Sequence, residues 1–149
     1  MSHFDDVKNF NKKFDLICHD DGEPVHLTKR KLRERFECMY EELNEFQVAI
    51  DTQDLEQQAD ALIDLVYFAV GTAVMLNLPW QELWDDVHRA NMTKERGMTK
   101  RGHKVDMIKP EGWVGPRTGD ILRSHGYVHE DWIDVETKIV DEGYCYDDQ

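Results

Sequence analysis

The sequence contains few cysteines, and their placement does not suit a disulfide framework or a zinc site. Cys18, Cys38 and Cys145 are odd in number and far apart, and no CxxC or HxxxH pair accompanies them. A reduced environment fits this pattern, so we expect a cytoplasmic protein. The first residues also lack the basic segment and apolar run of a secretory signal.

Positive charge is scarce as well. The chain has 18 lysines and arginines against 31 aspartates and glutamates, a net charge of −13. This excess repels duplex phosphates, so we expect no nucleic-acid partner. It leaves open a small anionic substrate held by metal ions or by a local basic patch. No Walker A motif is present, which excludes the P-loop mode of phosphate binding.

Alternating apolar and polar strands, internal repeats and low-complexity tracts are absent. A 149-residue chain with 40% hydrophobic residues predicts one folded domain. We expect an all-α fold of four to five helices, in a domain of residues 1–125 with a loop-rich extension and an acidic tail at 126–149. Helical spacing places these helices at about residues 4–14, 28–50, 55–77, 80–94 and 120–125.

The third helical stretch is apolar on most sides, which is typical of the centre of a bundle or of an oligomer interface. Asp64 interrupts its apolar run, and Gly71 and Thr72 soften it. We therefore predict a core helix and no membrane partner. The residues Asp51–Asp54 supply turn and capping chemistry, which predicts that the second and third helices are antiparallel neighbours.

Acidic residues cluster on both of these helices. Glu42 and Glu45 are three apart and share a helical face, while Glu41 points about 100° away. Asp60 and Asp64 share a face too, although like charges at that spacing destabilise a helix. Either pair alone is compatible with a solvated surface. Across a short turn, however, the four carboxylates reach a similar height and provide hard oxygen ligands for Mg²⁺, Mn²⁺ or Ca²⁺.

A basic segment follows the fourth helical stretch. Between Lys94 and Lys109 there are six basic residues against Glu95 and Asp106, a local charge of +4. This segment either balances surface charge, contacts the acidic tail or recognises phosphate. Trp113 follows it and is compatible with core packing or base stacking. An acidic cluster that can hold metal ions, combined with this basic segment, favours a metal–polyphosphate substrate.

These residues resemble the all-α nucleoside triphosphate pyrophosphohydrolases, which include MazG, dimeric dUTPase and phosphoribosyl-ATP pyrophosphohydrolase. The family signature is EExxE on one helix and ExxD on the next. Glu41–Glu45 matches the first half, but Gln57 replaces the leading glutamate of the second. The runs DALIDLVYFAVGTA, VHRANMTKERG and KRGHKVDMIKPEGWVGP resemble the phosphoribosyl-ATP pyrophosphohydrolase-like branch. The likeness covers roughly residues 4–122.

The resemblance implies a homodimer or homotetramer that uses Mg²⁺, or alternatively Mn²⁺, to cleave a nucleoside triphosphate into a monophosphate and pyrophosphate. It implies metal binding by Glu42, Glu45, Asp60 and Asp64. Glu41, Glu42 and Glu45 are the implied catalytic residues, and either Glu41 or Glu45 would orient or deprotonate water. The implied substrate-binding residues are Asn91 and Lys94, with Lys100 and Arg101 as candidates for the distal phosphates.

Two other hypotheses remain open, and Gln57 favours the first of them. One is a non-catalytic helical oligomer that binds metal or nucleotide for regulation. The other is a structural dimer whose acids only solvate a helix face.

Overall fold

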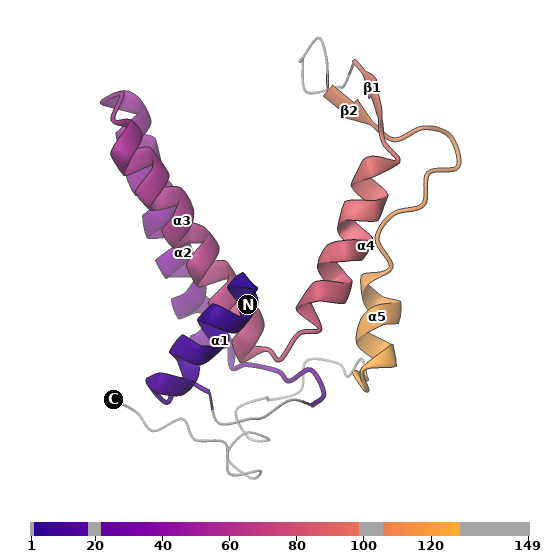
Figure 1. Cartoon of the computed structure of the whole chain (residues 1–149), viewed down its shortest axis with the longest axis horizontal. Coiled ribbons are helices and arrows are strands. Elements are labelled where there is room, and N and C mark those ends of the chain that lie inside the picture. The colour runs from indigo at the N-terminus through magenta and orange to yellow at the C-terminus, as the bar shows by residue number, and fades with distance from the viewer. Residues whose placement is uncertain (1, 18–21, 99–105, 129–149) are drawn as a thin grey trace. The chain divides into compact units, whose positions relative to one another are not determined.

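The computed structural model describes residues 2–17, 22–98 and 106–128. The described residues up to Leu78 form one compact unit, and Pro79–Tyr127 form a second. Five helices and a two-stranded antiparallel sheet lie within the described ranges, which confirms the all-α prediction (Figure 1). Most of the expected acidic tail lies outside them. The elements are α1 His3–Lys13, α2 Lys29–Asp51, α3 Leu55–Met75, α4 Trp80–Met92, β1 Glu95–Gly97, β2 Asp106–Ile108 and α5 Thr118–Ser124.

Helices α2 and α3 form the predicted antiparallel hairpin (Figure 1). The α2 helix begins after Thr28, whose hydroxyl accepts a hydrogen bond from the Lys31 amide at 3.0 Å. At the tip of the hairpin, Gln53 adopts a left-handed conformation with φ of 54°. The Asp54 carboxylate then caps α3 by accepting from the Gln57 amide at 3.1 Å. These capping bonds fix the length of the turn.

Two sets of hydrogen bonds hold the arms of the hairpin in register. Near the open end, Arg35 of α2 donates from Nε to Thr72 Oγ1 at 3.1 Å and from Nη2 to the Phe68 carbonyl at 2.9 Å. Near the tip, the side-chain amide of Gln58 donates to the Ala49 carbonyl at 3.1 Å. The stretch between these bonds is therefore aligned from both ends.

The buried core of this unit lies at the open end of the hairpin, where α1 packs on α3. Val7 contacts the Gly71 position, and the Asn11 amide donates to the Gly71 carbonyl at 3.5 Å. A Cβ at Gly71 would lie 2.9 Å from Arg35 Nη2, so glycine gives the guanidinium room. Residues buried here are Val7, Asn11, Leu27, Val70, Gly71, Ala73, Val74 and Met75.

From the level of the Arg35–Phe68 bond up to the tip, large apolar side chains of both arms are exposed in the single chain. Ile63 is 66% exposed and Phe36 is 61% exposed. The full set is Phe36, Tyr40, Leu43, Val48, Ile50, Leu55, Leu62, Ile63, Val66 and Tyr67. We call this set the hairpin apolar face. The length and composition of α3 also satisfy those of a membrane span, a test that core helices of soluble proteins pass as well.

The second unit contains strands that the sequence analysis did not predict. The sequence predicts no alternating strand, yet the short strands β1 and β2 pair, with Glu95 opposite Ile108 and Gly97 opposite Asp106. Each strand has only three residues, too few to show an alternating pattern. A Cβ at Gly97 would lie 2.6 Å from Ile108 Cδ1, so glycine permits the close approach of the strands.

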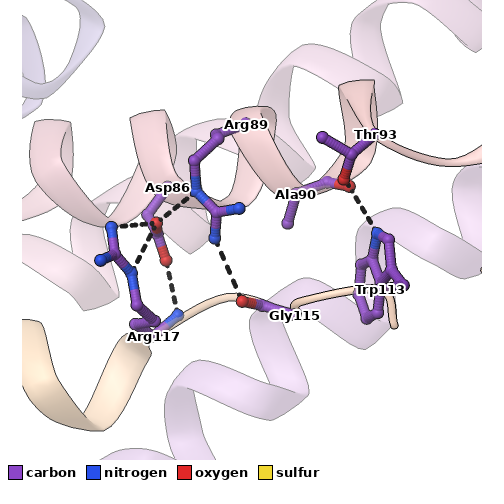
Figure 2. Close-up of polar contacts among 7 residues, drawn as sticks. All are labelled: Asp86, Arg89, Ala90, Thr93, Trp113, Gly115 and Arg117. Carbon is purple, nitrogen blue, oxygen red and sulfur yellow. Dashed lines mark hydrogen bonds and ion pairs between the residues drawn. The ribbon is translucent and has the colours of Figure 1, made fainter. Parts of the chain in front are cut away.

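A polar network holds the segment after β2 against α4 (Figure 2). The buried Asp86 carboxylate accepts from Arg89 Nε at 2.8 Å, from the Arg117 amide at 2.5 Å and from Arg117 Nη2 at 3.1 Å. Arg89 also donates to the Gly115 carbonyl at 3.1 Å. The Arg89 hydrogen bond, followed by that of the Arg117 amide, holds the pKa of Asp86 well below its ordinary value.

Asp86→Asn tests this network. A carboxyl group whose pKa falls on folding contributes stability above its unfolded pKa and loses it as the pH drops toward the folded value. The variant should therefore unfold at a lower temperature than the wild type at pH 7, with the difference shrinking below about pH 4. Thermal unfolding followed by circular dichroism measures this. The control is Asp120→Asn, which removes an exposed 2.6 Å pair with Arg123; equal effects of the two variants would contradict the prediction.

Candidate active site

The two acidic pairs lie on facing arms of the hairpin. Glu42 and Glu45 follow Arg35 on α2, and Asp60 and Asp64 precede Phe68 on α3. The Arg35 bonds on one side and the Gln58–Ala49 bond on the other enclose both pairs. The helix register thus places the acids of α2 opposite those of α3.

Glu42 is the most constrained of these acids. Its side chain is half-buried, and its Oε2 atom is buried with no hydrogen-bond partner among the described residues. Burial raises the pKa of Glu42, and the charges of Glu45, Asp64, Asp60 and Glu41 raise it further, in that order. Charges from both arms of the hairpin therefore act on Glu42. Leaving a buried charged acceptor unpaired generally costs roughly 1–3 kcal/mol or more.

The other four acids, Glu41, Glu45, Asp60 and Asp64, are exposed. Within the described part of the chain, no three Asp, Glu, His or Cys side chains converge as ligands of one ion. The site therefore combines one buried, unpaired carboxylate oxygen with exposed carboxylates around it. Carboxylate oxygens are the donors that Mg²⁺ and Mn²⁺ prefer.

The predicted substrate-binding residues lie in the second unit. Asn91 is exposed in the last turn of α4, and Lys94 is half-buried just before β1. Lys94 Nζ lies 5.7 Å from the centroid of the Trp113 ring. Lys100 and Arg101 lie outside the described residues.

Sequence reasoning missed the specific role of Lys109 at this place. Lys109 Nζ lies 4.8 Å from the centroid of the same Trp113 ring. The sequence counted Lys109 only as one member of the basic segment, because its position beside Lys94 depends on the unexpected strand pair. The run Lys109–Trp113 did contain a signal for this contact. Its Pro110 and Gly112 predict a turn, and a turn there brings the side chains of Lys109 and Trp113 close together.

Comparison with known families places the chain in the all-α nucleoside triphosphate pyrophosphohydrolase superfamily. A family model described as phosphoribosyl-ATP pyrophosphohydrolase matches residues 7–91. Because the match spans more than half of the chain, the protein belongs to the phosphoribosyl-ATP pyrophosphohydrolase family. It is accordingly a hydrolase acting on phosphoric anhydride bonds. No curated protein gives a significant match.

The matched region contains the whole hairpin, with all five acids, and ends at Asn91. The family resemblance drawn from the acidic motif is therefore confirmed. Lys94, the strand pair and Trp113 lie beyond the match, so their contribution has to be argued from the second unit itself.

Glu42→Gln tests the electrostatic cost of the acidic cluster. A carboxyl group whose pKa rises on folding stabilises the fold fully below its unfolded pKa, and this contribution is lost as the pH rises through the folded value. At pH 7 without divalent cations, the variant should therefore be more stable than the wild type, and the gain should vanish below about pH 4. Chemical denaturation at both pH values measures it.

Glu37→Gln is the matched control for this measurement, because Glu37 is an exposed glutamate on the same helix. A Glu42→Gln protein no more stable than the Glu37→Gln protein at pH 7 would show that the acids of the two arms do not repel one another.

Proposed function

We propose that the protein is a Mg²⁺-dependent pyrophosphohydrolase that cleaves (d)NTP to (d)NMP and pyrophosphate, with Mn²⁺ as an alternative ion. The observation that carries the proposal is the buried, unpaired Oε2 of Glu42 among four other interacting acids. Repulsion among fixed carboxylates is tolerated where a cation offsets it. Family membership supplies the class of bond that is broken.

Glu42, Glu45, Asp60 and Asp64 are the residues proposed to hold the metal. They come from both arms of the hairpin, and their oxygen donors suit a hard divalent cation. When bound, the ion neutralises phosphate charge and lowers the pKa of water. Gln57, which replaces the expected glutamate, lies exposed in the first turn of α3. Asp60 and Asp64 are therefore the proposed α3 ligands.

The proposed reaction is the attack of water on a phosphorus atom of the α,β-anhydride. The new bond joins the water oxygen to phosphorus, and the bond from phosphorus to the bridging oxygen breaks. Glu41 or Glu45 accepts a proton from the water, since both are exposed carboxylates beside Glu42. The products are a nucleoside monophosphate and pyrophosphate.

Asn91 and Lys94 are proposed to contact a phosphate or the sugar of the substrate, with Lys100 and Arg101 as further candidates for the distal phosphates. An amide and an ammonium group supply neutral and charge-assisted donors respectively. Asn91 lies in the last turn of α4, and Lys94 lies two residues beyond its end.

The hairpin apolar face supports a homodimer or a homotetramer. Ten large apolar side chains of α2 and α3 are exposed in the single chain, and contiguous exposed patches mark interaction sites. We propose that a second copy of the chain covers this face and completes a helical bundle around the acids. A closed two-fold pair would use the same face on both copies.

One observation favours a second candidate substrate. The matching family is described as phosphoribosyl-ATP pyrophosphohydrolase. Phosphoribosyl-ATP contains an α,β-anhydride bond, as nucleoside triphosphates do. The regulatory alternative, a non-catalytic oligomer that binds metal or nucleotide, stands on Gln57 alone.

An activity panel separates these candidates. NTPs, dNTPs and phosphoribosyl-ATP are incubated with Mg²⁺ and an inorganic pyrophosphatase, and phosphate is measured with malachite green. We expect turnover of at least one substrate, and a loss of roughly 100-fold or more in Glu45→Gln and Asp64→Asn, because even losing a group that only supports a metal ligand costs about 10–100-fold. Glu37→Gln should retain activity.

Lack of turnover throughout the panel would overturn the enzyme proposal. Stabilisation by Mg²⁺ that disappears in Asp64→Asn would then favour the regulatory alternative, and no response to metal would favour a structural dimer.

Ile63→Glu tests the proposed assembly. A charge at this 66% exposed position of α3 would be buried twice in a two-fold interface. We expect the wild type to sediment as a dimer or tetramer, and the variant to dissociate with a Kd raised roughly 100-fold. Val114→Glu, a charge at a 60% exposed position of the second unit, is the control. A monomeric wild type at all concentrations tested would refute the interface.

A further inference from the structure

The strand pair brings two lysines that are far apart in sequence to one end of the β-hairpin. Glu95 pairs with Ile108, and these are the first residue of β1 and the last residue of β2. Lys94 directly precedes this pair and Lys109 directly follows it. The register thus places both lysines at the same end of the ladder.

Trp113 lies against both lysines. The Trp113 amide donates to the Pro110 carbonyl at 3.1 Å, which closes a turn in which Gly112 has φ of 71°. A positive φ at this position requires glycine or a similarly permissive residue. The turn carries the indole back toward the ladder, where its centroid lies 5.7 Å from Lys94 Nζ and 4.8 Å from Lys109 Nζ.

The indole is anchored to α4. Its Nε1 donates to the Ala90 carbonyl at 2.9 Å, and Thr93 Oγ1 donates to the same carbonyl at 2.8 Å (Figure 2). The backbone at Gly115 also lies close to the indole, because a Cβ added there would lie 3.1 Å from the ring atom Cζ3. The Gly115 carbonyl accepts from Arg89 at 3.1 Å, so the backbone beside the ring is fixed by α4 as well. Trp113 is therefore a rigid platform for two flexible side chains.

The two ammonium groups have no carboxylate partner among the described residues. Glu95 and Glu111 are close in sequence and exposed, but neither forms an ion pair with Lys94 or Lys109. The ring attracts both cations within the usual range of about 6 Å, yet it offers no acceptor in its plane for their N–H groups. Two like charges beside one ring repel each other, and an anion that bridges them removes that repulsion.

We propose that Lys94 and Lys109 form a binding site for the pyrophosphate moiety of the substrate, and that Trp113 is the positioning residue that holds them. The proposal rests on the proposed function, because it assigns the phosphates that leave as pyrophosphate to this pair. Lysine is a compact charge with three donors, suited to the terminal oxygens of a polyphosphate. Two ammonium groups beside one ring can each contact one of two adjacent phosphates.

Binding of inorganic pyrophosphate tests the site without any turnover. Isothermal titration calorimetry at fixed low salt and without divalent ions compares the wild type with Lys94→Gln and Lys109→Gln. We expect either variant to bind pyrophosphate roughly tenfold or more weakly, since each loses a charge-assisted hydrogen bond. Lys13→Gln is the matched control: Lys13 Nζ lies 5.2 Å from the centroid of the Phe14 ring, and among the described residues no second lysine lies over that ring.

The role of Trp113 is tested by two substitutions. Trp113→Phe keeps an aromatic face but loses the bond to Ala90, and Trp113→Leu loses both. We expect affinity for pyrophosphate to fall in the order wild type, Phe, Leu. In turnover assays, Lys109→Gln should raise KM about tenfold with kcat within about twofold of wild type, because the interaction is present before the chemical step.

The inference is overturned if Lys109→Gln binds pyrophosphate as tightly as Lys13→Gln does, since the lysines would then only cover the indole. It is equally overturned if Trp113→Leu, folded by circular dichroism, binds as the wild type does. If pyrophosphate binding falls as expected but no substrate in the panel is hydrolysed, the inference stands and the proposed function fails. If a substrate is hydrolysed but the lysine variants bind pyrophosphate as tightly as the wild type, the proposed function stands and the inference about the lysines fails.

Discussion

The register between α2 and α3 is the constraint on which the site depends. Arg35 fixes it near the open end through Thr72 and Phe68, and the Asp54 cap with the Gln58 bond fixes it at the tip. Acids on two different helices interact only because these bonds leave no freedom to slide. The raised pKa of Glu42, due to burial and then to its neighbours, is the electrostatic result of that alignment.

The two units contribute in different ways. The hairpin gathers negative charge and leaves an apolar face uncovered, so its stability is linked to whatever covers that face. After α4, the described part of the second unit has two three-residue strands and the seven-residue α5. Side-chain bonds to α4 hold the segment between β2 and α5 in place. Asp86 serves this purpose because one carboxylate satisfies two arginines and a backbone amide together.

Much of the α2–α3 hairpin could be predicted from the sequence, because the patterns that determine it are local. Thr28 as a cap, the turn at Asp51–Asp54 and the helical spacing of apolar residues all depend on neighbours a few positions away. The strand pair and the contact of Trp113 with Ala90 were not readable, since each joins residues that only tertiary structure brings together.

The three residues between α2 and α3 have a consequence for how such a protein can change. A residue inserted into that turn can be absorbed as a longer loop, because the Arg35 and Gln58 bonds still align the arms. A residue inserted within α3 before Asp60 acts differently, since it rotates the rest of the helix by about 100° and shifts it by about 1.5 Å. Asp60 and Asp64 would then no longer face Glu42 and Glu45. The length of the first turns of α3 is therefore more tightly constrained than the length of the loop before it.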